Sequence, residues 1–366
     1  MSRRQPIGAW RGGGSGTVGT CAARKLLRAA CCLPGAVRKS RLAACALLCG
    51  AIAGCAPVSF LITPVPRVQE LRESEVARES LWAVDKVALL DLDGVLRNAR
   101  EPSLFGAAGE NPVSLFQEKL DRAARDGRVK AVVVRINSPG GGVTASDLLY
   151  SELLRFKEQT GKPVIAALLD TAASGGYYVA CAADKIYAQP TTVTGSIGVI
   201  MIAPEFSGTM RKLGIQANII KSAELKDAGS PFREMTEQDR AVFQQMIDAL
   251  YARFLGVVAR ARPGLDEGRL RALADGRVFL GPEAKERGLV DELGTLHDAI
   301  GAAKAAAGLG DKPVVVVEYA RPYLHRPNVY AEASDVPAQV NLVNVELPGW
   351  LRSPAPQFLY LWAPGW

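Results

Sequence analysis

The sequence predicts an α/β fold whose sheet is largely parallel. Two runs, Val129–Ile136 and Pro163–Leu169, are mostly apolar along their whole length, which is typical of parallel strands that are covered on both faces. Each run is followed by a stretch with helical character, and repeated strand–helix units favour a parallel sheet. With 366 residues, of which 48% are hydrophobic and 22% charged, the chain can form one large globular domain or two small ones.

The other elements are predicted from local patterns. Leu115, Phe116 and Leu120 share one face of a helix, and Thr236 begins a long helical stretch with acidic residues in its first turn. The first strand should end at a turn formed by Asp93 and Gly94. We expect strands at 86–92, 129–136, 163–169, 185–188 and 197–202, and helices at 112–125, 144–159 and 235–261.

The charge of the chain is unevenly distributed. Residues 1–41 contain nine lysine or arginine residues and no acidic residue, so removing them from the formal net charge of +7 leaves −2 for the rest. The part that folds is therefore close to neutral. This balance argues against a nucleic-acid partner.

An apolar run, Leu42–Ala53, follows the basic stretch, and together they have the order of an export signal. The run leads into Ile52-Ala-Gly-Cys55, which resembles a bacterial lipobox and predicts cleavage before Cys55 and lipidation of its thiol. Alternatively, the apolar segment extends to Ile62 and remains as an uncleaved anchor of about 20 residues, long enough to span a bilayer. Both interpretations place the following domain outside the cytoplasm.

Cysteine and histidine are scarce in the predicted domain. Of seven cysteines, only Cys181 lies beyond the export signal, so neither a disulfide framework nor a paired-cysteine metal site is expected there. The two histidines, His297 and His325, are not next to a catalytic-looking turn. We therefore expect no Ser-His-Asp triad, no metal site and no cofactor.

The segment Asp170–Tyr178 (D-T-A-A-S-G-G-Y-Y) places Ser174 at a strand-to-helix turn before two glycines. Such a turn can present a hydroxyl beside backbone N–H groups, as a nucleophile that attacks a carbonyl requires; it is also what a helix-capping serine needs. Without a histidine, the base would be a lysine that burial keeps uncharged. Lys226 is the candidate, and Lys221 is its local competitor.

The glycines of Gly140–Gly142 allow two interpretations. With Ala145 and Asp170 they satisfy much of a dinucleotide-binding fingerprint, although the third glycine is missing. Alternatively, they form an oxyanion loop whose bare N–H groups face a carbonyl.

Five motifs in order resemble the signal peptide peptidase A family of S49 serine peptidases, over residues 86–306 and in a single copy. They are N-S-P-G-G-G, D-T-A-A-S-G-G-Y-Y-V-A, T-G-S-I-G-V, K-S-A-E-L-K-D-A-G-S-P-F-R-E-M-T and D-G-R-V-F-L-G-P-E-A-K-E-R-G-L-V-D-E-L-G. The resemblance implies a crotonase-like fold related to Clp-type proteases.

The resemblance also implies a Ser/Lys dyad, with Ser174 as nucleophile and Lys226 as general base. Gly141 and Gly175 would supply oxyanion N–H groups, and Ser196 would hold the lysine amine. The sequence departs from the family at residues 223–225, Ala-Glu-Leu, where members often carry glycine and an aromatic residue.

These observations predict a membrane-tethered serine endopeptidase, and the family resemblance implies that it degrades cleaved signal peptides and other apolar peptides in extended form. The alternatives are a crotonase-type acyl-CoA enzyme and a catalytically silent membrane scaffold of the same fold. The resemblance further implies a homo-oligomeric ring. We divide the chain into an export signal or anchor (1–55), a tether (56–85), a peptidase domain (86–306) and a C-terminal strand with a Pro/Trp-rich tail (307–366).

Overall fold

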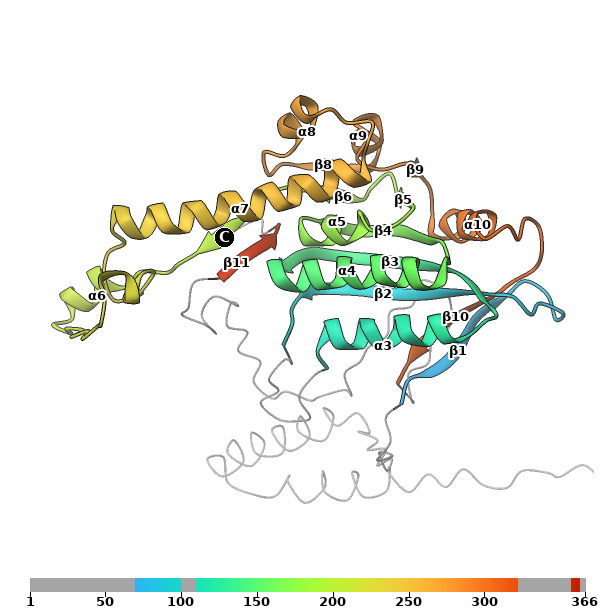
Figure 1. The fold of residues 1–366 in the computed structure, drawn as a ribbon, viewed down its shortest axis with the longest axis horizontal. Helices are drawn as coiled ribbons and strands as arrows, with labels where there is room; N and C mark the ends of the chain where they lie inside the picture. Colours follow the sequence, from blue (N-terminus) through green and yellow to red (C-terminus); the bar gives the residue numbers. More distant parts are fainter. Residues whose placement is uncertain (1–69, 100–109, 322–356, 363–366) are drawn as a thin grey trace, which may run out of the picture. The chain divides into compact units, whose positions relative to one another are not determined.

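The computed structural model describes residues 70–99, 110–321 and 357–362, which all belong to one compact unit that begins at Val68. Their strands join in one sheet of 11 strands with the central order β1-β10-β2-β3-β4-β5-β9 (Figure 1). The strands are β1 (Arg72–Arg78), β2 (Lys86–Leu96), β3 (Val129–Gly142), β4 (Val164–Ala173), β5 (Lys185–Ala188), β6 (Val193–Gly195), β7 (Ile200–Ile202), β8 (Val278–Leu280), β9 (Glu292–Leu293), β10 (Val315–Ala320) and β11 (Gln357–Leu361).

Eight α-helices and a 3₁₀ helix, η2 (Glu224–Asp227), complete the described part of the chain. The helices are α3 (Pro112–Arg125), α4 (Val143–Thr160), α5 (Gly175–Ala180), α6 (Ser207–Lys212), α7 (Glu237–Ala261), α8 (Glu267–Leu273), α9 (Gly281–Glu286) and α10 (Leu296–Ala306). The central strands β10, β2, β3, β4, β5 and β9 run parallel to one another. The predicted α/β fold with a largely parallel sheet is confirmed.

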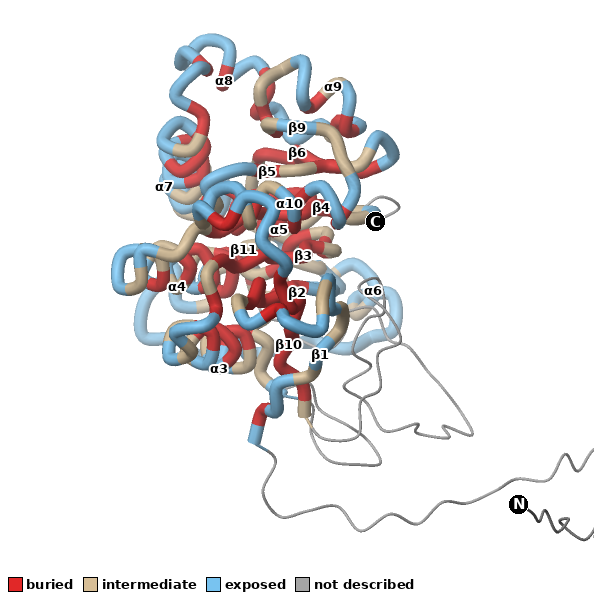
Figure 2. The backbone as a smooth tube through the Cα atoms, turned by 90° about the vertical axis from the view of Figure 1, so that its right-hand side faces the viewer, coloured by how far each residue is buried: buried red, intermediate tan, exposed pale blue. Residues whose placement is uncertain are grey.

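Alternating residues of the central strands fill two hydrophobic cores, one on each face of the sheet. On one face, residues such as Leu90, Val134 and Ala166 pack with side chains of α3, α4, α5 and α7. On the other face, residues such as Leu89 and Val133 pack against α10. Figure 2 shows the buried backbone concentrated in these strands. Because the strands are covered on both faces, they have the mostly apolar sequences noted above.

Strands β2 and β3 are longer than predicted. Strand β2 does not end at Asp93-Gly94, because after an irregularity Val95 pairs with Gly140 and Leu96 with Gly141. Strand β3 likewise runs on from Ile136 to the end of the glycine run. The glycines are therefore extended strand with neighbours on both sides, and they do not form the phosphate-binding loop of the dinucleotide interpretation.

Three further strands differ from the sequence-based expectations. Strand β1 lies in the segment interpreted as a tether, where it pairs antiparallel with β10. Strand β6 lies between β5 and β7, where no strand was predicted. It forms because β4 continues to Ala173, and its last residues pair with β6. Strand β7 begins only at Ile200, and Ile197 is instead buried in the core.

The residues between β7 and the middle of α7, which we call the arm, contribute little to the core. Of the first half of α7, only Asp239 is buried, and α6 lies at one end of the molecule in Figure 1. Apolar side chains of the arm are exposed, among them Leu213 (69%) and Ile220 (100%). Large apolar side chains exposed close together are typical of interaction surfaces.

Within the part of the chain that the structure describes, no helix is long and apolar enough to cross a membrane. The same residues contain no cluster of histidine, cysteine, aspartate or glutamate suited to a metal ion. The predicted export signal, including Cys55, lies outside the described residues.

Candidate active site

Ser174 lies between β4 and α5 in a strained backbone conformation, with φ 51° and ψ −113°. Its N–H donates to the carbonyl oxygen of Gly195 at 2.7 Å, and its own carbonyl accepts from the N–H of Tyr178 at 2.8 Å. The residue is buried. Among the described non-glycine residues, only Ser174 and Ser196 have a positive φ. Backbone strain of this kind is concentrated at functional sites. Both Ser174, the predicted nucleophile, and Ser196, predicted to hold the lysine amine, show it.

Two glycine motifs meet beside this serine. A Cβ on Gly140, where φ is 99°, would lie 2.6 Å from the backbone nitrogen of Gly175. A Cβ on Gly175 would lie 2.4 Å from the Oγ of Ser146 and 3.1 Å from the Cα of Gly140. Only residues without a side chain allow this approach. It brings Gly140, at the end of β3, next to the Ser174 turn; the predicted oxyanion residue Gly141 follows Gly140 on the same strand.

Hydroxyl side chains that the sequence analysis did not single out hold these turns in place. The buried Ser138 donates to the carbonyl oxygen of Gly94 at 2.6 Å and accepts from the N–H of Gly140 at 3.1 Å. Thr194 donates to the carbonyl oxygen of Ala172 at 2.6 Å. In the sequence, Ser138 stands two residues before Gly140, and Thr194 stands directly before Gly195. Such pairs are too common to identify these residues.

The last of the five motifs, which contains Arg277 and Leu289, makes hydrogen bonds to the Ser174 and Ser196 turns. The Ser196 N–H donates to the carbonyl oxygen of Arg277 at 2.8 Å, next to β8. The buried hydroxyl of Tyr177, three residues after Ser174, donates to the carbonyl oxygen of Leu289 at 2.7 Å. These bonds join β6, α5 and the segment around α9 into one support for Ser174 and Ser196.

Lys226 is exposed on η2, in the arm. In the described part of the chain its amine makes no hydrogen bond or ion pair, so a single chain does not join it to Ser174. Lys221 is engaged instead: its amine donates to the carbonyl oxygen of Glu224 and to Oδ1 of Asp227, both at 2.8 Å. Neither lysine is joined to Ser174 within the described chain, so the choice between Lys226 and Lys221 stays a prediction.

The turn that carries Lys226 is tied to the start of α7 by Arg233. The guanidinium donates to Oδ1 of Asp227 at 2.9 Å and to Oδ1 of Asp239 at 3.1 Å. Asp239 also closes a capping box with Thr236 at the first turn of α7. Hydrogen bonds from Arg233 lower the pKa of Asp239 to about 2 and also lower that of Asp227.

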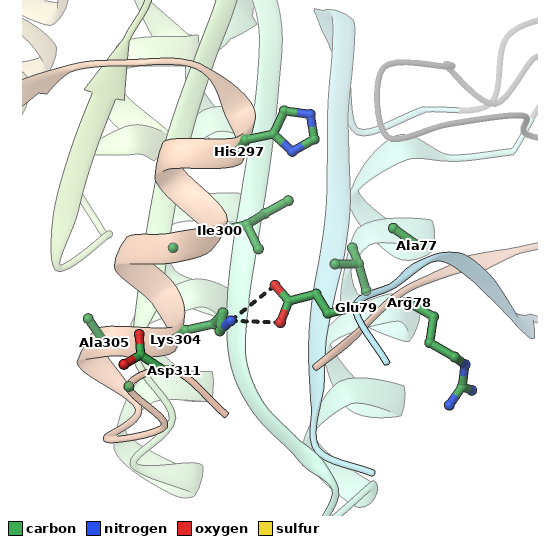
Figure 3. Close-up of a pocket in the computed structure, with 11 residues that line it drawn as sticks. Ala77, Arg78, Glu79, His297, Ile300, Lys304, Ala305 and Asp311 are labelled. Carbon is green, nitrogen blue, oxygen red and sulfur yellow. Dashed lines mark hydrogen bonds and ion pairs between the residues drawn. The ribbon is translucent and has the colours of Figure 1, made fainter. Parts of the chain in front are cut away.

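Two other features are not part of this site. A pocket of about 590 Å³ between β1 and α10 is lined by residues such as Ala77, His297 and Ile300, and includes none of the predicted site residues (Figure 3). Lys304 and Glu79 form an ion pair across it at 2.7 Å. Cys181 is buried in the core, and burial raises the pKa of its thiol to about 12, so it is an unreactive small hydrophobe.

Comparison with known proteins assigns the family. The model of "Peptidase family S49" matches residues 156–310. A protein of Synechocystis, provisionally assigned as a protease, is 36% identical over 243 residues, which are 66% of this chain and 82% of that protein. The chain belongs to peptidase family S49.

Further relatives agree with this assignment. A protein of Enterococcus faecium, provisionally assigned as a signal peptide peptidase, is 38% identical over 234 residues, 64% of this chain and 67% of its own. Protease 4 of Haemophilus influenzae is 31% identical over 272 residues, 74% of this chain but only 43% of its own length. The chain is thus a serine-type peptidase with the crotonase-like fold of the S49 family. The family favours this activity over that of an acyl-CoA enzyme with a related fold.

The Arg233 network predicts a pH-dependent stability of the arm. Because the folded-state pKa of Asp239 is about 2, below its ordinary value of 3.8, its ionised form stabilises the fold fully above about pH 4. That contribution is lost as the pH falls toward 2. Urea unfolding of the wild type and Arg233→Gln should show a stability difference at pH 6 that shrinks toward pH 2. A difference that does not change with pH would contradict this role.

Proposed function

We propose that the S49 peptidase is a membrane-tethered endopeptidase with a Ser/Lys dyad, which degrades cleaved signal peptides and other apolar peptides in extended form. The observation that carries the proposal is Ser174, buried and strained at the point where the two glycine motifs meet. The name of the Enterococcus relative supports the substrate class. The end of β3 at Gly140–Gly142, beside the Ser174 turn, pairs with an extended segment, β11, and extended is the form proposed for the substrate.

In the proposed reaction, the Ser174 hydroxyl attacks the peptide carbonyl while neutral Lys226 takes its proton. Lys226 then returns that proton to the leaving amine, and water hydrolyses the acyl-enzyme. Backbone N–H groups of Gly141 and Gly175 stabilise the negative charge that develops on the carbonyl oxygen. Ser196 orients the lysine amine. No metal or cofactor takes part in these steps.

The dyad is completed in a homo-oligomeric ring. Lys226 is exposed in the described chain, and its amine has no partner there. Much of the arm that carries it is also exposed, including large apolar side chains. A second copy packed against the arm would bury those side chains and enclose Lys226 beside a Ser174. Burial of this kind also favours the neutral form of a lysine, which the reaction needs.

Membrane attachment is assigned to the N-terminal segment, through a lipid on Cys55 or through the uncleaved apolar run. Its basic flank and apolar run place the peptidase on the extracytoplasmic side of the cell membrane.

Substitution of the dyad tests the mechanism. Ser174→Ala and Lys226→Ala should each lower peptidase activity by at least about 10³-fold, because each removes a group that acts in the transition state. Lys221→Ala should keep most of the activity, since that amine is held in an ion pair. A serine-reactive fluorophosphonate should label the wild type but not Ser174→Ala. An inactive Lys221 variant beside an active Lys226 variant would reassign the base.

Disruption of the arm tests the assembly. Ile220→Asp places a charge on a side chain that is 100% exposed, and it should dissociate the oligomer and lower activity together. The matched control is Leu81→Asp, whose side chain is 89% exposed in the loop between β1 and β2. It should leave both properties unchanged. Sedimentation and peptidase assays measure the two effects, and a fully active Ile220→Asp monomer would contradict the proposal.

Labelling tests the attachment. Cells given a palmitate analogue should incorporate it into the wild type and not into Cys55→Ser, because the thiol is the acceptor. A mature protein that retains residues 1–54 and carries no label would show that the anchor stays uncleaved.

A further inference from the structure

The loop between β1 and β2, residues 79–85, exposes three large apolar side chains. Leu81 is 89% exposed, Trp82 88% and Val84 64%. Apolar surface is unfavourable in water roughly in proportion to its area, so a group of such side chains favours contact with another apolar phase. Figure 1 shows this loop at the opposite end of the molecule from α6, so it is a different surface from the arm.

The loop has its own hydrogen bonds, which hold the apolar side chains outward. The guanidinium of Arg78 donates to the carbonyl oxygen of Ala83 at 3.0 Å. The N–H of Ala83 donates to the carbonyl oxygen of Ser80 at 3.0 Å, and the N–H of Trp82 donates to the Oγ of Ser80 at 3.3 Å. Because Ala83 is buried while the residues on both sides of it are exposed, the turn directs Trp82 and Val84 to the surface.

A basic residue lies next to each end of the loop. Arg128 is exposed, and its carbonyl oxygen accepts from the N–H of Lys86, the residue that follows the loop, at 2.8 Å. Lys312 is exposed two residues before Val314. The carbonyl oxygen of Val314 accepts from the N–H of Glu79, the first residue of the loop, at 3.1 Å.

The carboxylates of the loop lie close to lysines. Glu79 accepts from the amine of Lys304 at 2.7 Å, and Oδ1 of Asp85 lies 3.9 Å from the amine of Lys130. Asp311 is an exposed acidic neighbour. The surface thus has no large excess of either charge, and its apolar side chains decide which partner it suits.

The loop and Ser174 lie at opposite edges of the sheet. Strands β2, β3 and β4 run parallel, the loop precedes β2, and Ser174 follows β4. Strand β4 has 10 residues, which span roughly 33 Å at the rise of an extended strand. A partner bound at the loop is therefore separated from Ser174 by the length of the sheet.

The predicted tether is long enough for the loop to reach the membrane to which the chain is attached. Strand β1 has 7 residues, so the loop lies roughly 23 Å beyond the start of the strand. Cys55 precedes Arg72, the first residue of β1, by 17 residues, which span up to about 56 Å. If the anchor is uncleaved and ends at Ile62, 10 residues remain, or up to about 33 Å.

A lipid bilayer suits the chemistry of this surface. Tryptophan is enriched at the level of the lipid headgroups, because one end of the indole is apolar and the other carries a hydrogen-bond donor. Leucine and valine beside it add apolar area that the acyl chains can cover. Exposed basic residues next to such a contact interact with lipid phosphates.

We propose that the β1–β2 loop inserts Leu81 and Trp82 into the membrane at the boundary of headgroups and acyl chains, as a second contact besides the N-terminal attachment. The inference rests on the membrane attachment in the proposed function. The contact orients the peptidase, with the edge of the sheet that carries Ser174 directed away from the bilayer. It lies outside the arm and the candidate active site, so assembly and cleavage of soluble peptides are independent of it.

Quenching of Trp82 by lipid tests the insertion. The full-length protein is reconstituted into vesicles of phosphatidylethanolamine and phosphatidylglycerol with or without brominated acyl chains. Because the chain has five tryptophans, the emission of Trp82 is taken as the difference between the wild type and Trp82→Phe. Bromine quenches indole only at contact distance, so this difference signal should lose most of its intensity. A signal that the brominated chains leave unchanged would overturn the proposal.

A matched control moves the indole to the other edge of the sheet. The variant Trp82→Phe with Leu280→Trp carries it at a position that is 55% exposed on β8, which pairs with β6 beside the end of β4. Its difference signal should stay unquenched. Equal quenching at both positions would contradict a contact specific to the loop. Emission of Trp82 at short wavelength without quenching would show that protein, such as a second copy, covers the loop instead of lipid.

Two further measurements separate this inference from the proposed function. Flotation with the vesicles reports the N-terminal attachment, and fluorophosphonate labelling of Ser174 reports the nucleophile. A wild type that floats and is labelled but whose Trp82 is unquenched would refute the loop contact alone. A wild type that does not float would refute the attachment and the loop contact together.

Discussion

The close approach of Gly140 and Gly175 is the contact on which the candidate active site depends. It lets the end of β3 lie against the first turn of α5, so that backbone groups of both motifs surround one position beside Ser174. Any side chain at either glycine would overlap backbone or the Ser146 hydroxyl. The strained backbone is held by hydrogen bonds: the Ser174 N–H donates to the Gly195 carbonyl, its carbonyl accepts from the Tyr178 N–H, and the Ser196 N–H donates to the Arg277 carbonyl.

Helix α7 connects this rigid centre to the exposed arm. Its second half is part of the core through residues such as Phe254 and Val258, and its first half is largely exposed. At the start of the helix, Arg233 ties the turn of Lys226 to Asp239. One helix therefore connects the buried aromatic cluster of Tyr178, Phe254 and Tyr360 to the turn that carries Lys226.

Strand β11 joins the end of β3 to β7. It pairs antiparallel with Gly140–Gly142 on one edge and with β7 on the other. Its Tyr360 side chain is buried and stacks on Tyr178. A segment distant in the sequence therefore connects the central sheet to the beginning of the arm.

Local features were predictable from the sequence because the interactions that create them join residues close in the chain. Helix α3 begins at Pro112 and α7 begins directly after Thr236, close to where their patterns predicted; the structure adds the Asn111 cap and the Thr236–Asp239 capping box. The Ser174 turn was predicted in the same way, from an apolar strand followed by serine and two glycines. The ordered motifs also predicted the family.

What the sequence could not decide depends on partners that are distant in the chain. Strand β3 continues through its glycines because β2 and β11 pair with them, and β1 and β11 are strands because the sheet offers them open edges. The hydrogen-bond partners of a strand lie on other segments, so no local pattern reveals them. The family resemblance paired Lys226 with Ser174, but the fold of one chain leaves Lys226 exposed on η2. The surroundings of this lysine also depend on segments distant in the sequence. Only tertiary structure brings Tyr178, Phe254 and Tyr360 together in one buried aromatic cluster, because these residues lie far apart in the sequence.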